Sequence, residues 1–155
     1  MSKQWHQHNL RVHYKETDQM GVVHHANYVS WFEIGRTEYM REKGLNYRKI
    51  EELGLLLPVL DVNVRYQKPA RYDDYVAIFT QLTDFSPVRL KFAYEVRKID
   101  DTVAHNNYEE RPYGELLSTG STLHMWVNEN WRPKRLDKAE PEIYQQLAAL
   151  VQDES

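Results

Sequence analysis

The place of one long helix in the order of elements most constrains this fold. From residue 27 to about residue 43, aromatic and apolar residues recur at helical spacing and form a broad stripe. A segment of alternating apolar and polar residues, 8–15, precedes this helix, and several further strand-like segments follow it. This order is typical of the α+β class. We therefore predict a curved antiparallel sheet packed against one face of the long helix.

Local signals predict where the elements begin and end. Asn27 has the short acceptor side chain of an N-cap, and Gly44 can end the helix in a left-handed conformation. Gly54 is expected to stop a second, shorter helix. The remaining expectations are a short helix over 46–53, strands over 56–67, 75–84, 88–99 and 115–127, a turn over 68–74, a polar loop over 100–114, and a C-terminal helix with Pro141 near its start.

A glycine in the middle of the long helix carries structural information. Gly35 costs about 1 kcal/mol relative to alanine at such a position. This cost is tolerable where the backbones of helix and sheet must approach closely. The alternative is an ordinary glycine on a surface helix.

Composition limits the classes of protein to consider. At 155 residues, the chain is expected to form one domain over residues 1–155. A net charge of -3 and a pI near 6.2 give no basic field for nucleic acid. The chain has no cysteine, which excludes disulfides and thiolate nucleophiles and fits a reducing compartment. No apolar run approaches the ~20 residues that span a bilayer. We expect a cytoplasmic protein with no membrane insertion.

The segment 16–28 combines a carboxylate with a predicted helix start. Asp18 appears where the first strand-like segment stops, and Gly21 allows a tight turn. The first amides of a helix lack intrahelical partners and carry partial positive charge, so the backbone near His25 is expected to accept a carbonyl oxygen. The alternative for Asp18 is an ordinary turn or cap residue.

Two motifs carry a resemblance to a known family. Together they resemble the signature of small hotdog-fold acyl-CoA thioesterases of the 4-hydroxybenzoyl-CoA thioesterase family. The first is Asp18-Gln19-Met20-Gly21-Val22-Val23-His24-His25-Ala26-Asn27-Tyr28, followed by Trp31-Phe32-Glu33 and Arg36, and the second is Tyr66-Gln67-Lys68-Pro69-Ala70-Arg71-Tyr72-Asp73-Asp74. The likeness extends to a late strand that ends in Val127-Asn128.

The resemblance implies a function and a mode of assembly. It implies hydrolysis of an acyl-CoA, with Asp18 as nucleophile or general base and the His25 amide facing the thioester carbonyl. Coenzyme A is then part of the substrate, and no separate cofactor is expected. Members of this type work as homodimers or homotetramers with the ligand tunnel at the subunit interface. Two alternatives stay open: a hotdog hydratase or dehydratase, and a silent module that binds acyl-CoA or acyl carrier protein.

A wider set of residues is expected to contact the substrate. Arg71, Arg89 and Lys91 are candidates for the phosphates of coenzyme A, with a solvated sheet face as an equal alternative. Glu33 is a second candidate carboxylate, because some hotdog enzymes take theirs from the central helix; the alternative is an ion pair with Arg36. The full expected substrate set is Gly21, Val23, Asn27, Tyr28, Glu33, Arg71, Arg89 and Lys91.

The adjacent histidines invite a metal interpretation that the spacing does not favour. His24 and His25 cannot easily share one ion, and no further ligand stands at a familiar spacing. We therefore expect no metal site. The imidazole of His25 is instead a candidate for contacting the substrate or orienting Asp18.

Overall fold

A six-stranded antiparallel sheet carries one long helix across one face. The computed structural model describes residues 5–100, 108–109 and 111–151. In the order β2-β6-β4-β3-β1-β5, every neighbouring pair of strands is antiparallel. The elements are β1 (Trp5–Arg11), the 3-10 helix η1 (Tyr14–Glu16), α1 (Ala26–Glu42), α2 (Tyr47–Glu52), β2 (Val59–Tyr66), β3 (Tyr75–Phe85), β4 (Arg89–Lys98), β5 (Tyr108–Glu109), β6 (Glu115–Met125), α3 (Leu136–Ala139) and α4 (Pro141–Val151). The predicted α+β class and antiparallel sheet are confirmed.

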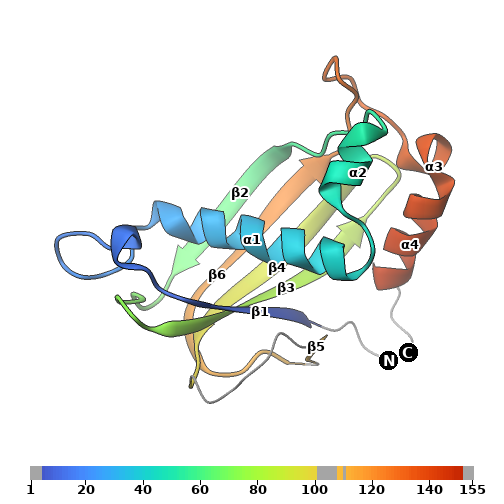
Figure 1. Ribbon diagram of the computed structural model, residues 1–155. Coiled ribbons are helices and arrows are strands. Elements are labelled where there is room, and N and C mark those ends of the chain that lie inside the picture. The colour runs from blue at the N-terminus through green and yellow to red at the C-terminus, as the bar shows by residue number, and fades with distance from the viewer. Residues whose placement is uncertain (1–4, 101–107, 110, 152–155) are drawn as a thin grey trace.

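The two ends of the molecule differ. The start of α1 and η1 lie at one end, whereas α2, α3 and α4 gather at the other (Figure 1). Within the described residues, no helix combines the length and the apolar character needed to cross a bilayer.

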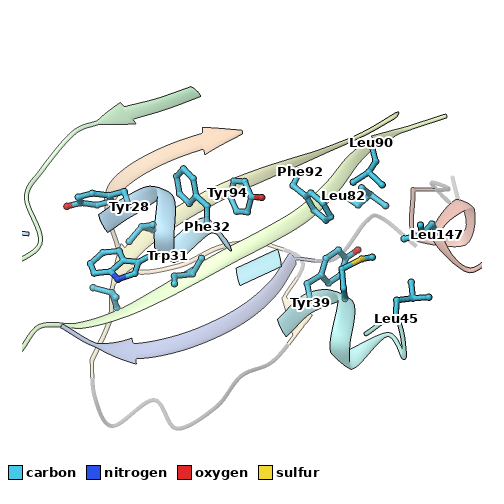
Figure 2. Packing of buried hydrophobic residues seen from close by; sticks show 14 of the residues in the cluster. Tyr28, Trp31, Phe32, Tyr39, Leu45, Leu82, Leu90, Phe92, Tyr94 and Leu147 are labelled. Atoms are coloured by element: carbon cyan, nitrogen blue, oxygen red, sulfur yellow. The ribbon is translucent and has the colours of Figure 1, made fainter. Parts of the chain in front are cut away.

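The core lies between α1 and the sheet. Phe32 and Tyr39 project from α1 toward the sheet, where Tyr94 and Phe92 of β4 meet them (Figure 2). The rings of Phe32 and Tyr94 stack with centroids 4.3 Å apart. Burying each such side chain stabilises the fold by about 2–3 kcal/mol. These contacts fix the position of α1 on the sheet and therefore the position of its first turn.

Gly35 is required where α1 approaches β3 most closely. A Cβ atom at this position would lie 2.6 Å from Thr80 Oγ1 and 2.8 Å from Ile78 Cγ2. Real Cβ atoms do not come this close to their neighbours. The prediction that this glycine serves a close approach of helix and sheet is confirmed.

The first strand lies nearer the N-terminus than predicted. β1 ends at Arg11, and the backbone then turns, because Val12 N donates to Asp74 O at 2.9 Å and Glu16 N donates to His13 O at 3.0 Å. The apolar alternation that suggested a strand over 8–15 continues into this turn. There it has no structural meaning, because Tyr14 is 76% exposed.

Several predicted boundaries are confirmed and one region differs. Gly44 and Gly54 follow their helices with positive φ, and Asn46 caps α2 by accepting a hydrogen bond from Arg48 N at 2.8 Å. The expected loop 100–114 falls largely outside the described residues. Its described part includes β5, which pairs with Trp5 and His6 of β1.

One side of α1 and the strand β2 remain open in the single chain. As predicted, the sheet covers one face of α1, and Val29 and Ile34 of this helix are exposed. β2 forms one edge of the sheet, and the exposed apolar residues on it include Val59, Leu60 and Val62.

Candidate active site

A tight hairpin joins η1 to α1 and carries Asp18. Asp18 N donates to Val22 O at 2.8 Å, and Gly21 N donates to Asp18 O at 3.0 Å. Thr17 and Val23 pair across the base of this hairpin. Gly21 has φ +77, a conformation that other residues rarely adopt. The predicted turn at Gly21 is confirmed.

The Asp18 carboxylate is held by one oxygen. Its Oδ1 accepts hydrogen bonds from Met20 N at 2.8 Å and from Val22 N at 3.4 Å. No donor among the described residues contacts Oδ2. The side chain is partly buried, so backbone amides orient one oxygen and leave the other available as a base or a nucleophile.

The helix begins earlier than the sequence predicted, which changes the role of Asn27. α1 starts at Ala26 with His25 as its flanking residue, so Asn27 lies inside the first turn and is not the N-cap. The imidazole of His24 takes part of the capping role, because Ala26 N donates to His24 Nδ1 at 3.2 Å. Asn27 Nδ2 instead donates to Glu16 O at 2.9 Å and ties the helix to η1.

At the start of α1, one amide has no acceptor among the described residues. Asn27 N donates to His24 O at 2.9 Å, and Tyr28 N donates to His25 O at 3.3 Å. In contrast, the amide of His25 has no acceptor in the described part of the chain. Because unpaired N–H groups at a helix start attract negative charge, this amide is the natural partner for a carbonyl oxygen.

Glu16 connects the elements that carry the hairpin, a role that the sequence did not reveal. Its Oε1 accepts from His13 N and its Oε2 accepts from Trp31 Nε1, both at 2.8 Å. Its backbone oxygen accepts from His24 N at 2.9 Å and from Asn27 Nδ2. Glu16 therefore holds η1, the end of the hairpin and α1 in one arrangement.

An apolar pocket opens beside His25. Its volume is about 230 Å³, and it is lined by Val23, His25, Tyr28, Tyr66, Gln67, Lys68 and Pro69. Tyr66 Oη, at the end of β2, donates to His25 O at 2.9 Å. The ring of Tyr66 also meets that of Tyr28 edge-on, with centroids 5.2 Å apart. Asp18 is not among the lining residues, so in a single chain it stands outside the pocket, across the base of the hairpin.

Comparison with known proteins identifies the family. A sequence profile described as the thioesterase-like superfamily matches residues 12–147. This chain belongs to the thioesterase-like superfamily. The predicted resemblance to hotdog-fold thioesterases is thereby confirmed.

Two relatives and one solved structure illustrate the likeness. The chain is 34% identical over 134 residues to the putative acyl-CoA thioesterase YneP of Bacillus subtilis, covering 86% of this chain and 88% of that protein. It is 33% identical over 94 residues to the acyl-CoA thioester hydrolase YbgC of Escherichia coli, covering 61% and 70%. The crystal structure of DHNA-CoA thioesterase from Staphylococcus aureus superposes with a TM-score of 0.81 at 31% identity, covering 94% and 90%.

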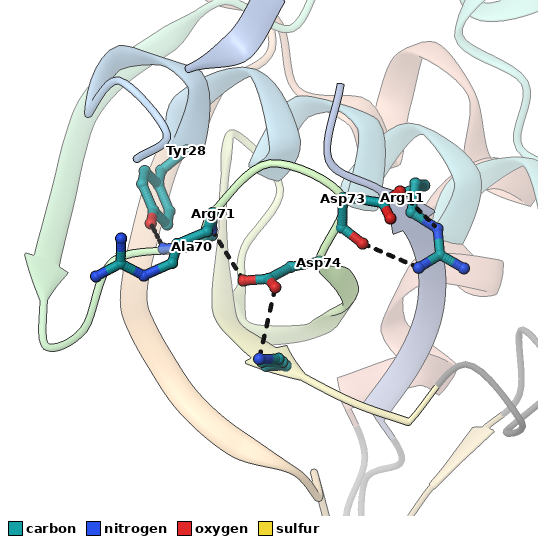
Figure 3. Close-up of polar contacts among 7 residues, drawn as sticks. Arg11, Tyr28, Ala70, Arg71, Asp73 and Asp74 are labelled. Atoms are coloured by element: carbon teal, nitrogen blue, oxygen red, sulfur yellow. Dashed lines mark hydrogen bonds and ion pairs between the residues drawn. The ribbon is translucent and has the colours of Figure 1, made fainter. Parts of the chain in front are cut away.

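The turn before β3 brings further predicted residues of this thioesterase-like chain to the hairpin. Tyr28 is buried, and its Oη accepts a hydrogen bond from Ala70 N at 3.1 Å (Figure 3). Burial raises the pKa of Tyr28, which therefore keeps its hydroxyl proton. Val22 pairs with Arg71, and Arg71 N donates to Asp74 Oδ2 at 2.9 Å. The Arg71 guanidinium extends away from this turn and forms no ion pair within the described residues.

Two predicted cations lie at the opposite end of the sheet. Arg89 starts β4 beside α3, where Leu136 N donates to Pro87 O at 2.7 Å. The far end of β4, at Lys98, pairs with Val76 near the hairpin. Strand geometry separates the two ends of β4 by about 30 Å. A single thioesterase-like chain therefore does not bring Arg89 or Lys91 to Asp18. The position of each residue along β4 decides which end of the sheet it reaches, and residue type alone does not predict that position.

Glu33 also lies apart from Asp18. It lines a different cavity, between α1 and α2, and among the described residues it forms no ion pair with Arg36. His24 and His25 stack with ring centroids 4.2 Å apart. They belong to no cluster of three or more potential metal-binding side chains within residues 5–100, 108–109 and 111–151.

Proposed function

We propose that this chain hydrolyses acyl-CoA thioesters to a free carboxylic acid and coenzyme A. The observation that carries the proposal is the His25 amide at the start of α1, which has no acceptor in residues 5–100, 108–109 and 111–151. It follows the loop that holds Asp18 by one carboxylate oxygen. An apolar pocket beside this amide suits an acyl group. The names of the relatives YneP and YbgC support a thioester substrate.

In the proposed reaction, the thioester carbonyl oxygen accepts a hydrogen bond from His25 N. Such a donor stabilises the developing oxyanion by roughly 3 kcal/mol. Asp18 Oδ2 either attacks the carbonyl carbon, expelling coenzyme A as a thiolate and leaving an anhydride that water opens, or removes a proton from the water that attacks. Both routes give the same products. Neither requires a cofactor or a metal, because a thiolate leaves readily.

Substrate contacts follow from the residues near the pocket. Val23 and Tyr28 line it, Gly21 shapes the hairpin, and Asn27 fixes the first turn of α1. We propose the Arg71 guanidinium as a phosphate contact for coenzyme A, because it is exposed and extends toward solvent. We expect the reaction to take place in the cytoplasm, where a chain without cysteine needs no oxidising conditions.

We further propose a homodimer that pairs two β2 strands. β2 is an open edge strand with exposed apolar residues on it, which is an arrangement that favours pairing with a second chain. Antiparallel pairing reverses the second copy, so its Arg89 and Lys91 approach the Asp18 end of the first. Light scattering should give twice the mass of the chain or a multiple of it. A fully active monomer would contradict this proposal.

The test of the reaction uses Asp18→Asn and Asp18→Ala. Release of free thiol from a panel of acyl-CoAs should fall by at least about 100-fold in both variants, the lower bound for losing a general base. Asp84→Asn, an exposed aspartate at the end of β3, is the matched control and should keep full turnover. Near-normal turnover in a folded Asp18 variant would remove Asp18 from the mechanism. A hydratase would change enoyl absorbance without releasing thiol, and a silent binding module would do neither.

A further inference from the structure

A second cavity lies between α1 and α2, at the end of the molecule opposite the hairpin. Its volume is about 170 Å³. It is lined by Glu33, Arg36 and Thr37 from α1, Tyr47, Ile50 and the exposed Glu51 from α2, and Leu55 and Leu57 from the segment before β2. A cavity of roughly 150 Å³ holds a benzene molecule. The space is therefore large enough for a small organic group.

Among the described residues, Arg36 has no carboxylate partner and the Tyr47 hydroxyl has no acceptor. Arg36 is partly buried and forms no ion pair with any carboxylate among the described residues. The Tyr47 hydroxyl is buried and has no hydrogen bond of good geometry there. Arg36 lies beside this hydroxyl, but a guanidinium only donates, so the Tyr47 proton still has no acceptor. A buried hydroxyl without an acceptor costs stability, and a guanidinium without a carboxylate partner is available to bind an anion.

The positive charge of Arg36 acts on the buried groups around it. Its charge opposes the upward effect of burial on the pKa of Tyr47 and of Tyr94, and it adds to the downward effect of burial on the pKa of His124. For Tyr47, this effect of Arg36 outweighs the opposing charge of Glu33, which is exposed and therefore better screened.

The groups behind Arg36 already satisfy one another. Tyr94 Oη and Thr122 Oγ1 lie 2.6 Å apart, and Thr122 Oγ1 and His124 Nε2 lie 2.8 Å apart. His124 Nδ1 lies 3.4 Å from Leu57 O. None of these contacts involves Tyr47, so its hydroxyl is available to a ligand.

We propose that the cavity between α1 and α2 binds a carboxylate carried on a short apolar stem. The carboxylate accepts hydrogen bonds from the Arg36 guanidinium and the Tyr47 hydroxyl, and the stem packs against Ile50, Leu55 and Leu57. This site goes beyond the proposed hydrolysis, because Arg36 is about 16 Å along α1 from His25 at the helical rise per residue. The carboxylate has two possible sources: a free carboxylic acid, or the far end of a long dicarboxylic acyl group bound at the hairpin.

Binding is tested on the full chain without acyl-CoA. Butyrate and benzoate are titrated by calorimetry, with butyramide and benzamide as uncharged analogues. The carboxylates should bind saturably and the amides at least about tenfold more weakly. Tyr47→Phe and Arg36→Gln should each weaken the carboxylates by roughly ten- to a hundredfold, the range for a hydrogen bond to a charged group. Arg48→Gln, an exposed cation on α2, should leave binding unchanged.

Melting temperatures and the Asp18 variant show whether Tyr47 serves a ligand or the fold. Tyr47→Phe should not lower the melting temperature, because it removes a buried hydroxyl that has no acceptor. Binding that persists in Asp18→Asn places the carboxylate away from the hairpin. Equal affinity for the amides, unchanged binding in both Tyr47→Phe and Arg36→Gln, or no saturable binding by the wild-type chain would each overturn the proposal.

A second measurement distinguishes the two sources. If the carboxylate belongs to the acyl group, Tyr47→Phe should lower kcat/KM for dodecanedioyl-CoA by about tenfold and leave lauroyl-CoA unchanged. If the ligand is a free acid, the two substrates should respond alike, and benzoate should change lauroyl-CoA turnover only when Tyr47 is present. A chain that binds benzoate but hydrolyses neither substrate would sustain the carboxylate site and refute the proposed function.

Discussion

Glu16 offers the sharpest test of how the fold positions the proposed site. Glu16→Gln keeps the size of the side chain but replaces one carboxylate oxygen with an amide NH₂. In the wild type, both oxygens accept hydrogen bonds, one from His13 N and one from Trp31 Nε1, each at 2.8 Å. The amide can serve only one of these donors, and its NH₂ then faces the other donor.

The expected loss follows from this geometry. Losing one hydrogen bond to a charged group removes roughly 1.5–3 kcal/mol when the pair is buried. Glu16 is only partly buried, so we expect the free energy of unfolding to fall by about 1–2 kcal/mol. At roughly 2–4 °C per kcal/mol for a domain of this size, the melting temperature should fall by about 2–8 °C.

The assay combines thermal unfolding with thiol release well below the melting temperature. Because Glu16 O also holds His24 N and Asn27 Nδ2, movement of this residue should displace the His25 amide and lower kcat by about tenfold or more. Glu52→Gln, the same change at an exposed residue of α2, is the control. A Glu16→Gln chain with the wild-type melting temperature and full turnover would refute the reasoning that Glu16 positions the hairpin.

Two further predictions concern the core. Gly35→Ala should lower the free energy of unfolding, measured in urea, by about 1–2 kcal/mol. The reason is that overpacking against Thr80 and Ile78 costs more than the gain in helix propensity of about 1 kcal/mol. An equally stable variant would show that α1 shifts freely on the sheet. Burial, with a smaller contribution from Arg36, lowers the pKa of His124 from 6.5 to about 4. The unfolded chain therefore binds more protons below pH 6.5, and stability should fall as the pH drops from 6.5 toward 4, by about 2 kcal/mol at pH 5 relative to pH 8. His124→Gln should show a smaller decrease between these pH values in urea unfolding, and an unchanged decrease would contradict a buried neutral imidazole.

Local patterns predicted the elements whose signal lies in neighbouring residues. The periodicity of α1 and the alternation of β4 follow directly from the faces that they bury, and Gly44 and Gly54 end helices by their own backbone conformation. β5 was missed because a two-residue strand is defined by its partner, β1, and carries no pattern of its own.

The site was predictable only where its residues are close in sequence. The hairpin with Asp18 and Gly21 was predicted. Asn27 was predicted as the N-cap from its residue type alone. In the structure, the amide of Ala26 donates to the imidazole of His24 instead. The bonds of Glu16 to α1 depend on tertiary packing. Likewise, nothing in the composition of β4 states which end of the sheet Arg89 reaches.

The two edges of the sheet differ in length, and this difference bears on how many chains can assemble. β2 is eight residues long, and no described strand pairs with its outer side. At the opposite border, the two-residue strand β5 covers only Trp5 and His6 of β1. Such a short strand is a poor template for another chain. Joining two copies through β2 uses the same edge of both chains, so this contact closes on itself as a pair, and any larger assembly has to use another surface.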